Sequence, residues 1–304
     1  FPPLVTGLVV LAIGLYLIPV AIKYAAGGAA DFQMAAESFG SLKHWSVALT
    51  VVVVALICKF TGKGLISNAG ILIGMIVAYI LAFALGMVNF DGVTKASWIT
   101  GLQVLPYGFE FNLGAVIGVT IVSIVSAIET VGDTSATTKA GAGRDATDEE
   151  IAGATYADGL GTAVAAVFGG LPNTSFSQNV GIVGMTGVMS RHVVSIGALV
   201  LIIGGLLPKI GAVIASMPMP VLGGGVIVMF GMVAAAGMNM LSEVTMNRRN
   251  MLIIAISLAV GLGFNLVPSA VQYLPGIWKT LATSAVAPTA VVAIVLNLVL
   301  PQEE

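Results

Sequence analysis

Charged residues are what this sequence has least of. Lysine, arginine, aspartate and glutamate make up only 9% of its 304 residues, while 58% are hydrophobic and the mean hydropathy is +1.04. A soluble domain carries about 25% charged residues, so this supply cannot cover a water-exposed surface. The sequence therefore predicts an all-α polytopic membrane protein lying in a lipid bilayer. The net charge of -2 argues against nucleic acid as a partner.

Cysteine and histidine are also scarce, and this limits the chemistry that can be expected. The single cysteine, Cys58, excludes an internal disulfide and lies in an apolar run, which indicates a small buried side chain. His44 and His192 fall at the ends of apolar runs without cysteine or histidine at ligand spacing, so no metal site is predicted. The sequence contains no nucleophile elbow, phosphate loop or HExxH pattern, so we do not expect an enzyme.

Long apolar runs, in contrast, recur along the whole chain. About ten of them are long enough to cross roughly 30 Å of hydrocarbon as helices, with ends defined to a few residues. Two connections, 92–112 and 268–284, carry aromatic residues typical of the membrane interface. The predicted spans are 4–22, 45–60, 65–88, 114–138, 151–170, 176–190, 193–216, 218–241, 250–267 and 285–300.

The distribution of basic residues suggests an orientation. Seven lysines and arginines fall in one alternate set of connections and five in the other, which places the first set in the cytoplasm. The run "GRDATDEE", residues 143–150, belongs to the cytoplasmic set. Its acids are expected to cap the next helix rather than to bind a cation.

Glycine is abundant, with 38 residues, and many glycines lie inside the predicted spans. This pattern indicates close packing of helices through small residues. A hinge for a moving part of the protein is the alternative.

Three acids stand within predicted spans: Glu129, Asp133 and Asp158. A carboxylate at the centre of a membrane helix costs about 2.5–3.5 kcal/mol, so the three should face a polar interior. Glu129 and Asp133 are four residues apart and share one helix face. Because two neighbouring carboxylates repel each other, we expect one of them to be protonated part of the time. A structural role in hydrogen bonding is the alternative, and for Asp158 the two readings weigh the same.

The stretch "PNTSFSQNVGIVGMTG", residues 172–187, is a polar patch between strongly apolar segments. Pro172 requires an extended residue before it. We therefore predict a short irregular or strand-like stretch that stops within the membrane and restarts as a half-helix near Ser177. Broken helices at membrane depth are tolerated where they line a cavity, and their free amides then point at bound solute. A re-entrant kink that only packs is the alternative.

The pattern "QNVGIVGMTG", residues 178–187, resembles the signature of the nucleobase–ascorbate transporters: Gln or Glu, Asn, one residue, Gly, four residues, Thr. The blocks "ETVGDTSAT", "MTGVMSRHV" and "VLGGGVIVMFGMV" agree with the same family, and the resemblance covers essentially the whole chain.

The resemblance implies a uracil-permease-like fold of fourteen spans in two inverted repeats, with core and gate domains, that usually works as a dimer. Residues 1–113 would be gate helices (family spans 5–7) followed by the interfacial segment. Residues 114–217 would be the second half of the core domain with the substrate site (family spans 8–11), and 218–304 would be gate helices (family spans 12–14). The first four helices of the family plan would be absent.

The resemblance also assigns roles to the substrate-binding residues. Glu129 would accept hydrogen bonds from ring N–H groups of a planar base. Phe176 would stack on the ring, and Ser177 would present its backbone amide. Gln178 would read the edge of a purine, because an amide offers both a donor and an acceptor.

Three further residues would support the site or couple it to protons. Asp133 is a candidate protonation site, Asp158 matches an acid of the neighbouring span, and Asn179 would tie the half-helix to its neighbours.

The implied function is import of xanthine or uric acid across the plasma membrane by proton symport, as a homodimer and without a cofactor. Sodium is not excluded as the coupling ion. Two alternatives stay open: a sulfate- or bicarbonate-type anion transporter of the same fold, which Glu129 disfavours because a carboxylate repels an anion, and an inactive truncated membrane protein.

Overall fold

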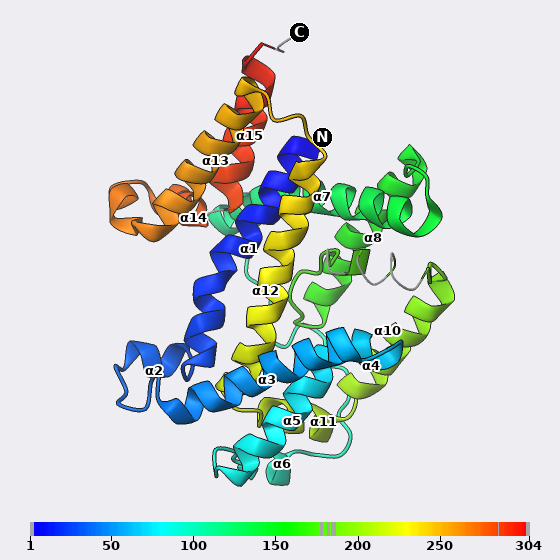
Figure 1. Cartoon of the computed structure of the whole chain (residues 1–304), viewed down its shortest axis with the longest axis vertical. Coiled ribbons are helices and arrows are strands. Elements are labelled where there is room, and N and C mark those ends of the chain that lie inside the picture. Colours follow the sequence, from blue (N-terminus) through cyan, green and yellow to red (C-terminus); the bar gives the residue numbers. More distant parts are fainter. Residues whose placement is uncertain (1–2, 177–178, 181–182, 184–186, 285, 302–304) are drawn as a thin grey trace. The chain divides into compact units, whose positions relative to one another are not determined.

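The computed structural model describes residues 3–176, 179–180, 183, 187–284 and 286–301, and within these ranges all regular structure is helical (Figure 1). This confirms the predicted all-helical class. The elements are α1 (Pro3–Ala25), α2 (Ala29–Gln33), α3 (Leu42–Thr61), α4 (Leu65–Asn68), α5 (Gly70–Ala84), α6 (Asp91–Lys95), α7 (Leu113–Ala142), α8 (Asp148–Val167), α10 (Arg191–Gly205), α11 (Pro208–Ala215), α12 (Met219–Ser242), α13 (Arg248–Leu266), the 3-10 helix η1 (Pro268–Val271), α14 (Gly276–Thr283) and α15 (Val286–Val299).

Five of the described helices are long and apolar enough to cross a membrane: α1, α3, α7, α12 and α13. The bent pair α10 and α11 would make a sixth, and α5 and α15 are shorter apolar helices. These helices begin within a few residues of the predicted positions, because continuous apolar runs of this length favour helices. The count of about ten spans stays a prediction, and the predicted span 176–190 falls largely outside the described residues.

The predicted continuous span 193–216 is wrong in one respect. Helices α10 and α11 meet at an angle of 89°. The break lies at Leu206 and Leu207, directly before Pro208, the first residue of α11. Proline disfavours the helical conformation in the residue before it, and Leu207 accordingly has a non-helical backbone (φ -113°, ψ 82°).

The chain divides into two compact units, each assembled from separate segments. The first unit comprises Phe1–Tyr16, Gln103–Met189 and Met232–Glu304, and the second comprises Leu17–Leu102 and Ser190–Gly231. The predicted gate and core boundaries follow a different division and stay predictions.

The second unit is held together by close helix contacts at glycine. Its core contains Val47 and Val51 of α3, Ala78 and Ala82 of α5, and Val221 of α12. A Cβ atom on Gly74 of α5 would lie 2.6 Å from the carbonyl oxygen of Val51, so α5 can approach α3 this closely only with glycine there. Glycines 223 and 224 of α12 likewise face the backbone of α1 and α3. The predicted packing through small residues is confirmed at these positions.

In the first unit, α1 supplies most of the core. Buried side chains of its first three turns pack with α12, α13 and α15 around Ile253 and Ala293. Gly237 of α12 lies against the backbone of Leu11, which lets these two helices approach closely. Helix α7 packs on α8 and also contacts α14 and α15, and this arrangement creates the space described below.

The start of α8 shows why the chain turns there. The Thr147 hydroxyl accepts a hydrogen bond from the Glu150 backbone N–H (3.2 Å), and the Glu150 carboxylate accepts one from the Thr147 backbone N–H (2.9 Å). Arg144 also donates two hydrogen bonds to Glu150, at 2.8 and 2.7 Å. The Arg144 hydrogen bond, followed by the Thr147 backbone N–H, lowers the pKa of Glu150 to about 2. The prediction that acids of this loop cap the next helix is confirmed.

Candidate functional site

The first unit contains a cavity of about 1060 Å³ between α7, α8, the irregular segment 170–176 and the region of α14 and α15. Ligand sites for small molecules are typically about 300–1,000 Å³ with a few convergent polar groups in an apolar wall. The polar residues that line this cavity are Ser123, Ser126, Glu129, Thr155, Asp158, Thr162, Asn173, Thr174 and Ser284. Its size and lining are those of a small-molecule site.

One face of α7 provides a wall of this cavity and carries Glu129. Residues 115, 118, 122, 126 and 129 recur at intervals of three or four, so they lie on one side of the helix. The small side chains of Ala115, Gly118 and Ser126 leave room in front of the helix. Among the described residues, no hydrogen bond or ion pair reaches the Glu129 carboxyl group. Glu129 therefore presents its acceptors to the cavity.

Asp133, one turn further along α7, has a different environment. It is buried, with only 6% of its surface exposed, and it is not part of the cavity wall. The Ser175 hydroxyl donates a hydrogen bond to its Oδ2 at 2.6 Å. The two neighbouring acids thus have different surroundings. Glu129 faces the cavity, whereas Asp133 accepts a hydrogen bond from the irregular segment.

Asp158 lines the cavity from α8 and is bonded at both oxygens. Its Oδ1 accepts from the Asn173 side chain (2.9 Å), and its Oδ2 accepts from the Thr130 hydroxyl of α7 (3.0 Å). These contacts connect α7, α8 and the irregular segment through a single carboxyl group. Hydrogen bonds of this kind are what the alternative role for Asp158, a structural one, requires.

The segment 170–176 was predicted to be irregular or strand-like, and it is irregular, without a strand in this described stretch. Several of its polar groups bond to side chains of α7 and α8. The Asn173 backbone N–H donates to Thr162 at 3.1 Å, and Ser126 donates to the Thr174 hydroxyl at 3.0 Å. Of the two predicted forms, these residues take the irregular one, so the predicted interruption is confirmed here.

The remaining predicted site residues follow this segment. Phe176 is exposed and does not line the cavity, and Asn179 is exposed, with its backbone N–H donating to the Phe176 carbonyl at 2.9 Å. Ser177 and Gln178 lie outside the described residues, so the structure does not bear on their predicted roles.

Several residues that line the cavity, or that bond to its lining as Thr130 does, were not identified from the sequence. Thr130, Thr162, Asn173 and Thr174 make most of the hydrogen bonds that order the site. The polar run "PNTS" was visible in the sequence. An irregular segment has no periodicity, however, so the pattern could not show which of its side chains reach α8.

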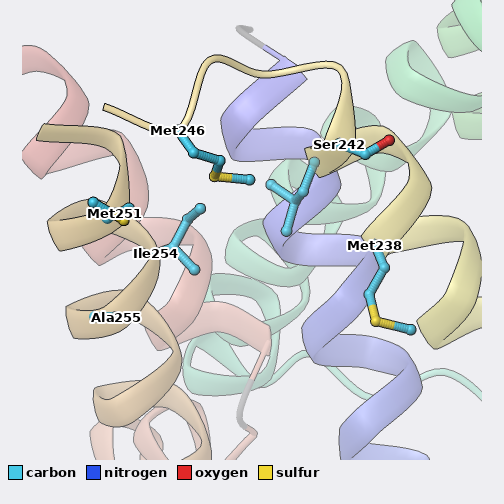
Figure 2. Close-up of a pocket in the computed structure, with 7 residues that line it drawn as sticks. Met238, Ser242, Met246, Met251, Ile254 and Ala255 are labelled. Carbon is cyan, nitrogen blue, oxygen red and sulfur yellow. The ribbon is translucent and has the colours of Figure 1, made fainter. Parts of the chain in front are cut away.

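A second pocket in the first unit, of about 400 Å³, is far less polar. Figure 2 shows its methionines, Met238, Met246 and Met251, around an opening between α12 and α13, with Ser242 as its one polar side chain. It lacks the convergent hydrogen-bonding groups that would orient a planar base. Within the described part of the chain, no group of three or more His, Cys, Asp or Glu residues could hold a metal ion.

Comparison with known proteins agrees with this membrane character. A family model described as "Permease family" matches residues 1–270. The chain is similar to a putative purine permease of Clostridium perfringens, with 43% identity over 308 residues that cover 99% of this chain and 66% of the relative. It is also similar to the xanthine permease of Bacillus subtilis, with 37% identity over 98% of this chain and 67% of the relative. The third similarity is to a uric acid transporter of Escherichia coli, with 36% identity over 98% of this chain and 61% of the relative.

The chain spans about two-thirds of the length of these relatives. The matches run over nearly all of this chain, and they do not support the prediction that four helices of the family plan are absent.

Proposed function

The chain belongs to the permease family, and from this membership we propose that it carries a purine base, xanthine or uric acid, across the plasma membrane. As a member of this family it is a multi-pass membrane protein. The observation that carries the proposal is the position of Glu129, whose carboxyl group faces a cavity of about 1060 Å³ among apolar helices.

The chemistry of Glu129 suits a ring with N–H donors. An ionised carboxylate is an acceptor only, so it pairs with the N–H groups at the edge of a purine oxidation product. Hydroxyl groups of Ser123, Ser126 and Thr155 line the same cavity. Those of Ser126 and Thr155 already donate to the Thr174 hydroxyl and the Ile151 carbonyl, so they are left to accept from a base. In this proposal Ser177 offers its backbone N–H, and the Gln178 amide reads the remaining edge, while stacking by Phe176 is left out because its side chain lies outside the cavity wall.

We further propose that transport is coupled to protons. Protonation of the Glu129 and Asp133 pair would remove the repulsion between two acids one helical turn apart and favour binding of the base. Coupling of this kind requires the base to bind the protonated state better by about 1–3 kcal/mol. Asn179 and Asp158 would support the site. Sodium is the alternative coupling ion. The working form in this proposal is a homodimer.

An anion transporter of the same fold is the less suitable reading. The carboxyl group of Glu129 in the cavity wall would repel an inorganic anion such as sulfate. The cavity is also larger than a small inorganic anion needs, whereas a bicyclic base with several hydrogen-bonding atoms can use its polar lining.

The test is uptake of radiolabelled xanthine and urate by cells that lack purine uptake of their own. We expect accumulation with the unchanged protein and its loss on addition of a protonophore. Glu129→Gln should lower uptake by at least about tenfold, because one charge-assisted hydrogen bond contributes about 1.5–3 kcal/mol. The amount of the Glu129→Gln variant in the membrane should equal that of the unchanged protein.

Glu149→Gln is the matched control. Glu149 lies in the first turn of α8 and is exposed, away from the cavity, so uptake should stay normal. Normal purine uptake by Glu129→Gln would contradict the assigned role of Glu129. Competition by sulfate and not by purines would contradict the substrate class.

A further inference from the structure

Asn173 makes more side-chain and backbone hydrogen bonds to α8 than any neighbouring residue of the irregular segment. Its backbone N–H donates to the Thr162 hydroxyl (3.1 Å), and the same hydroxyl lies within donating distance of the Asn173 side-chain oxygen (3.0 Å) and backbone oxygen (3.2 Å). Its side-chain NH2 group donates to Asp158 at 2.9 Å. Asn173 is therefore held at both its backbone and its side chain.

The orientation of the Asn173 amide follows from the chemistry of its partners. An ionised carboxylate can only accept, so the NH2 group must face Asp158, and the carbonyl oxygen is left for the Thr162 hydroxyl. Asp158 and Thr162 are four residues apart and share one face of α8. Gly161 lies beside them, and a Cβ atom there would approach the Asn173 amide to 3.0 Å, so this glycine leaves space for the side chain.

The contact continues from Asn173 to the residue beside Glu129. Asp158 accepts from Asn173 at one oxygen and from Thr130 at the other. Thr130 is buried and directly follows Glu129 in α7. The irregular segment, α8 and the Glu129 region of α7 are thus connected by two consecutive hydrogen bonds through a single carboxyl group.

We propose that Asn173 is a positioning residue, which acts through Asp158 to fix the irregular segment 170–176 against α8 and opposite Glu129. This role rests on the proposed function, because the position matters for the base that the cavity would bind. Asp158 then serves as the acceptor that joins Asn173 to Thr130, and the carboxyl group is needed for its hydrogen bonds rather than as a carrier of the transported proton.

Exchanging the two side chains tests this assignment. Asn173→Asp alone places two carboxyl groups within hydrogen-bonding distance, where they repel each other. Asp158→Asn alone keeps a carbonyl oxygen for either Asn173 or Thr130, but its NH2 group cannot accept. The double variant Asn173→Asp with Asp158→Asn restores every bond: the new amide donates to residue 173 and accepts from Thr130, and the new carboxylate accepts from Thr162.

Two measurements report on the variants. The first is the apparent KM and maximal rate of xanthine uptake, corrected for the amount of protein in the membrane. The second is hydrogen exchange of the backbone amides in residues 170–176, which follows the position of the segment without reference to any solute.

We expect Asn173→Asp to raise the apparent KM by at least about tenfold and to accelerate exchange in 170–176, since a charge-assisted hydrogen bond is lost. Asp158→Asn should have a smaller effect. The double variant should return the KM to within about threefold of the unchanged protein and restore the slow exchange. If Asn173→Asp fails to reach the membrane, recovery of its membrane level in the double variant is the same rescue.

Asn247→Asp is the matched control, because Asn247 caps α13 by accepting from the Asn250 N–H, and aspartate caps a helix equally well. Uptake and exchange in 170–176 should not change. The inference is overturned if Asn173→Asp leaves exchange and KM unaltered, or if the double variant is as impaired as the single one. If the unchanged protein takes up no purine, the proposed function fails, while the exchange pattern still decides the role of Asn173.

Discussion

Individual glycines in this chain differ in the atoms that a side chain added at their position would contact. A Cβ atom on Gly74 of α5 would lie 2.6 Å from the backbone oxygen of Val51 in α3. Gly211 of α11, in the same unit, has no described atom within 4 Å of that position apart from its chain neighbours and its own helix backbone. The first glycine permits a helix contact, while the second only loosens its own helix, because glycine disfavours helix formation by about 1 kcal/mol relative to alanine.

We therefore predict opposite effects of alanine at these two positions. Gly74→Ala should lower the free energy of unfolding by about 1–3 kcal/mol, because α3 and α5 must move apart. Gly211→Ala should leave stability unchanged or raise it slightly. Thermal unfolding of the purified protein in detergent provides the measurement. Equal stability of the two variants would show that α3 and α5 are not in close contact at Gly74.

The acids show how far single residues could be read from the sequence. That they need a polar interior follows from the cost of a carboxylate in hydrocarbon, and Glu129 and Asp158 do line a cavity. Their separate partners could not be predicted. Ser175 and Asn173, which bond to Asp133 and Asp158, lie in an irregular segment where residue spacing does not determine direction.

Among the elements, the end of α15 is held by a side chain from the start of α13. The Arg249 guanidinium donates to the backbone oxygens of Leu300 (3.1 Å) and Asn297 (2.6 Å), and also to the Asn297 side chain (3.2 Å). The last carbonyl groups of a helix lack partners within the helix, and a cation at that end is favourable. Arg249 therefore satisfies α15 and joins it to α13.

Arg249→Lys should destabilise this junction, although the charge is kept. Lysine has one ammonium group and cannot reproduce the planar fork of donors, so we expect a loss of about 1–3 kcal/mol and faster amide exchange in residues 296–300. Arg248→Lys is the control, since Arg248 is exposed and makes no hydrogen bond or ion pair within the described ranges. Unchanged exchange in Arg249→Lys would mean that α15 is held by apolar packing alone.

Helix positions were predictable because each apolar run long enough for a span has few ways to satisfy its backbone other than as a helix. The start of α8 was predictable as well, since threonine followed three residues later by glutamate forms a capping box. The bend before α11 was not predicted, although Pro208 carried the signal. Hydropathy is averaged over a window of many residues, so a single proline between two apolar segments hardly changes the average.

At the scale of the whole molecule, the sequence makes a prediction about sidedness that follows from the distribution of lysine and arginine. The loop 143–150 should face the cytoplasm, and the connection 92–112 the opposite side. Helix α7 runs between these two segments and is long and apolar enough to cross the membrane. The cavity residue Glu129 lies on this helix, so its orientation sets the side from which the cavity is reached.

The single cysteine makes this orientation simple to measure. In a Cys58→Ala background, one cysteine at a time is introduced at exposed positions, as Asp145→Cys in the loop or as Ser97→Cys in the connection. An impermeant thiol reagent added to intact cells should label Cys at 97 within minutes and should label Cys at 145 only after the membrane is opened. The reverse order would invert the assigned orientation, and labelling of both from one side would show that α7 does not cross. In that last case Glu129 could not be presented across the bilayer, and a carrier built around it would be untenable.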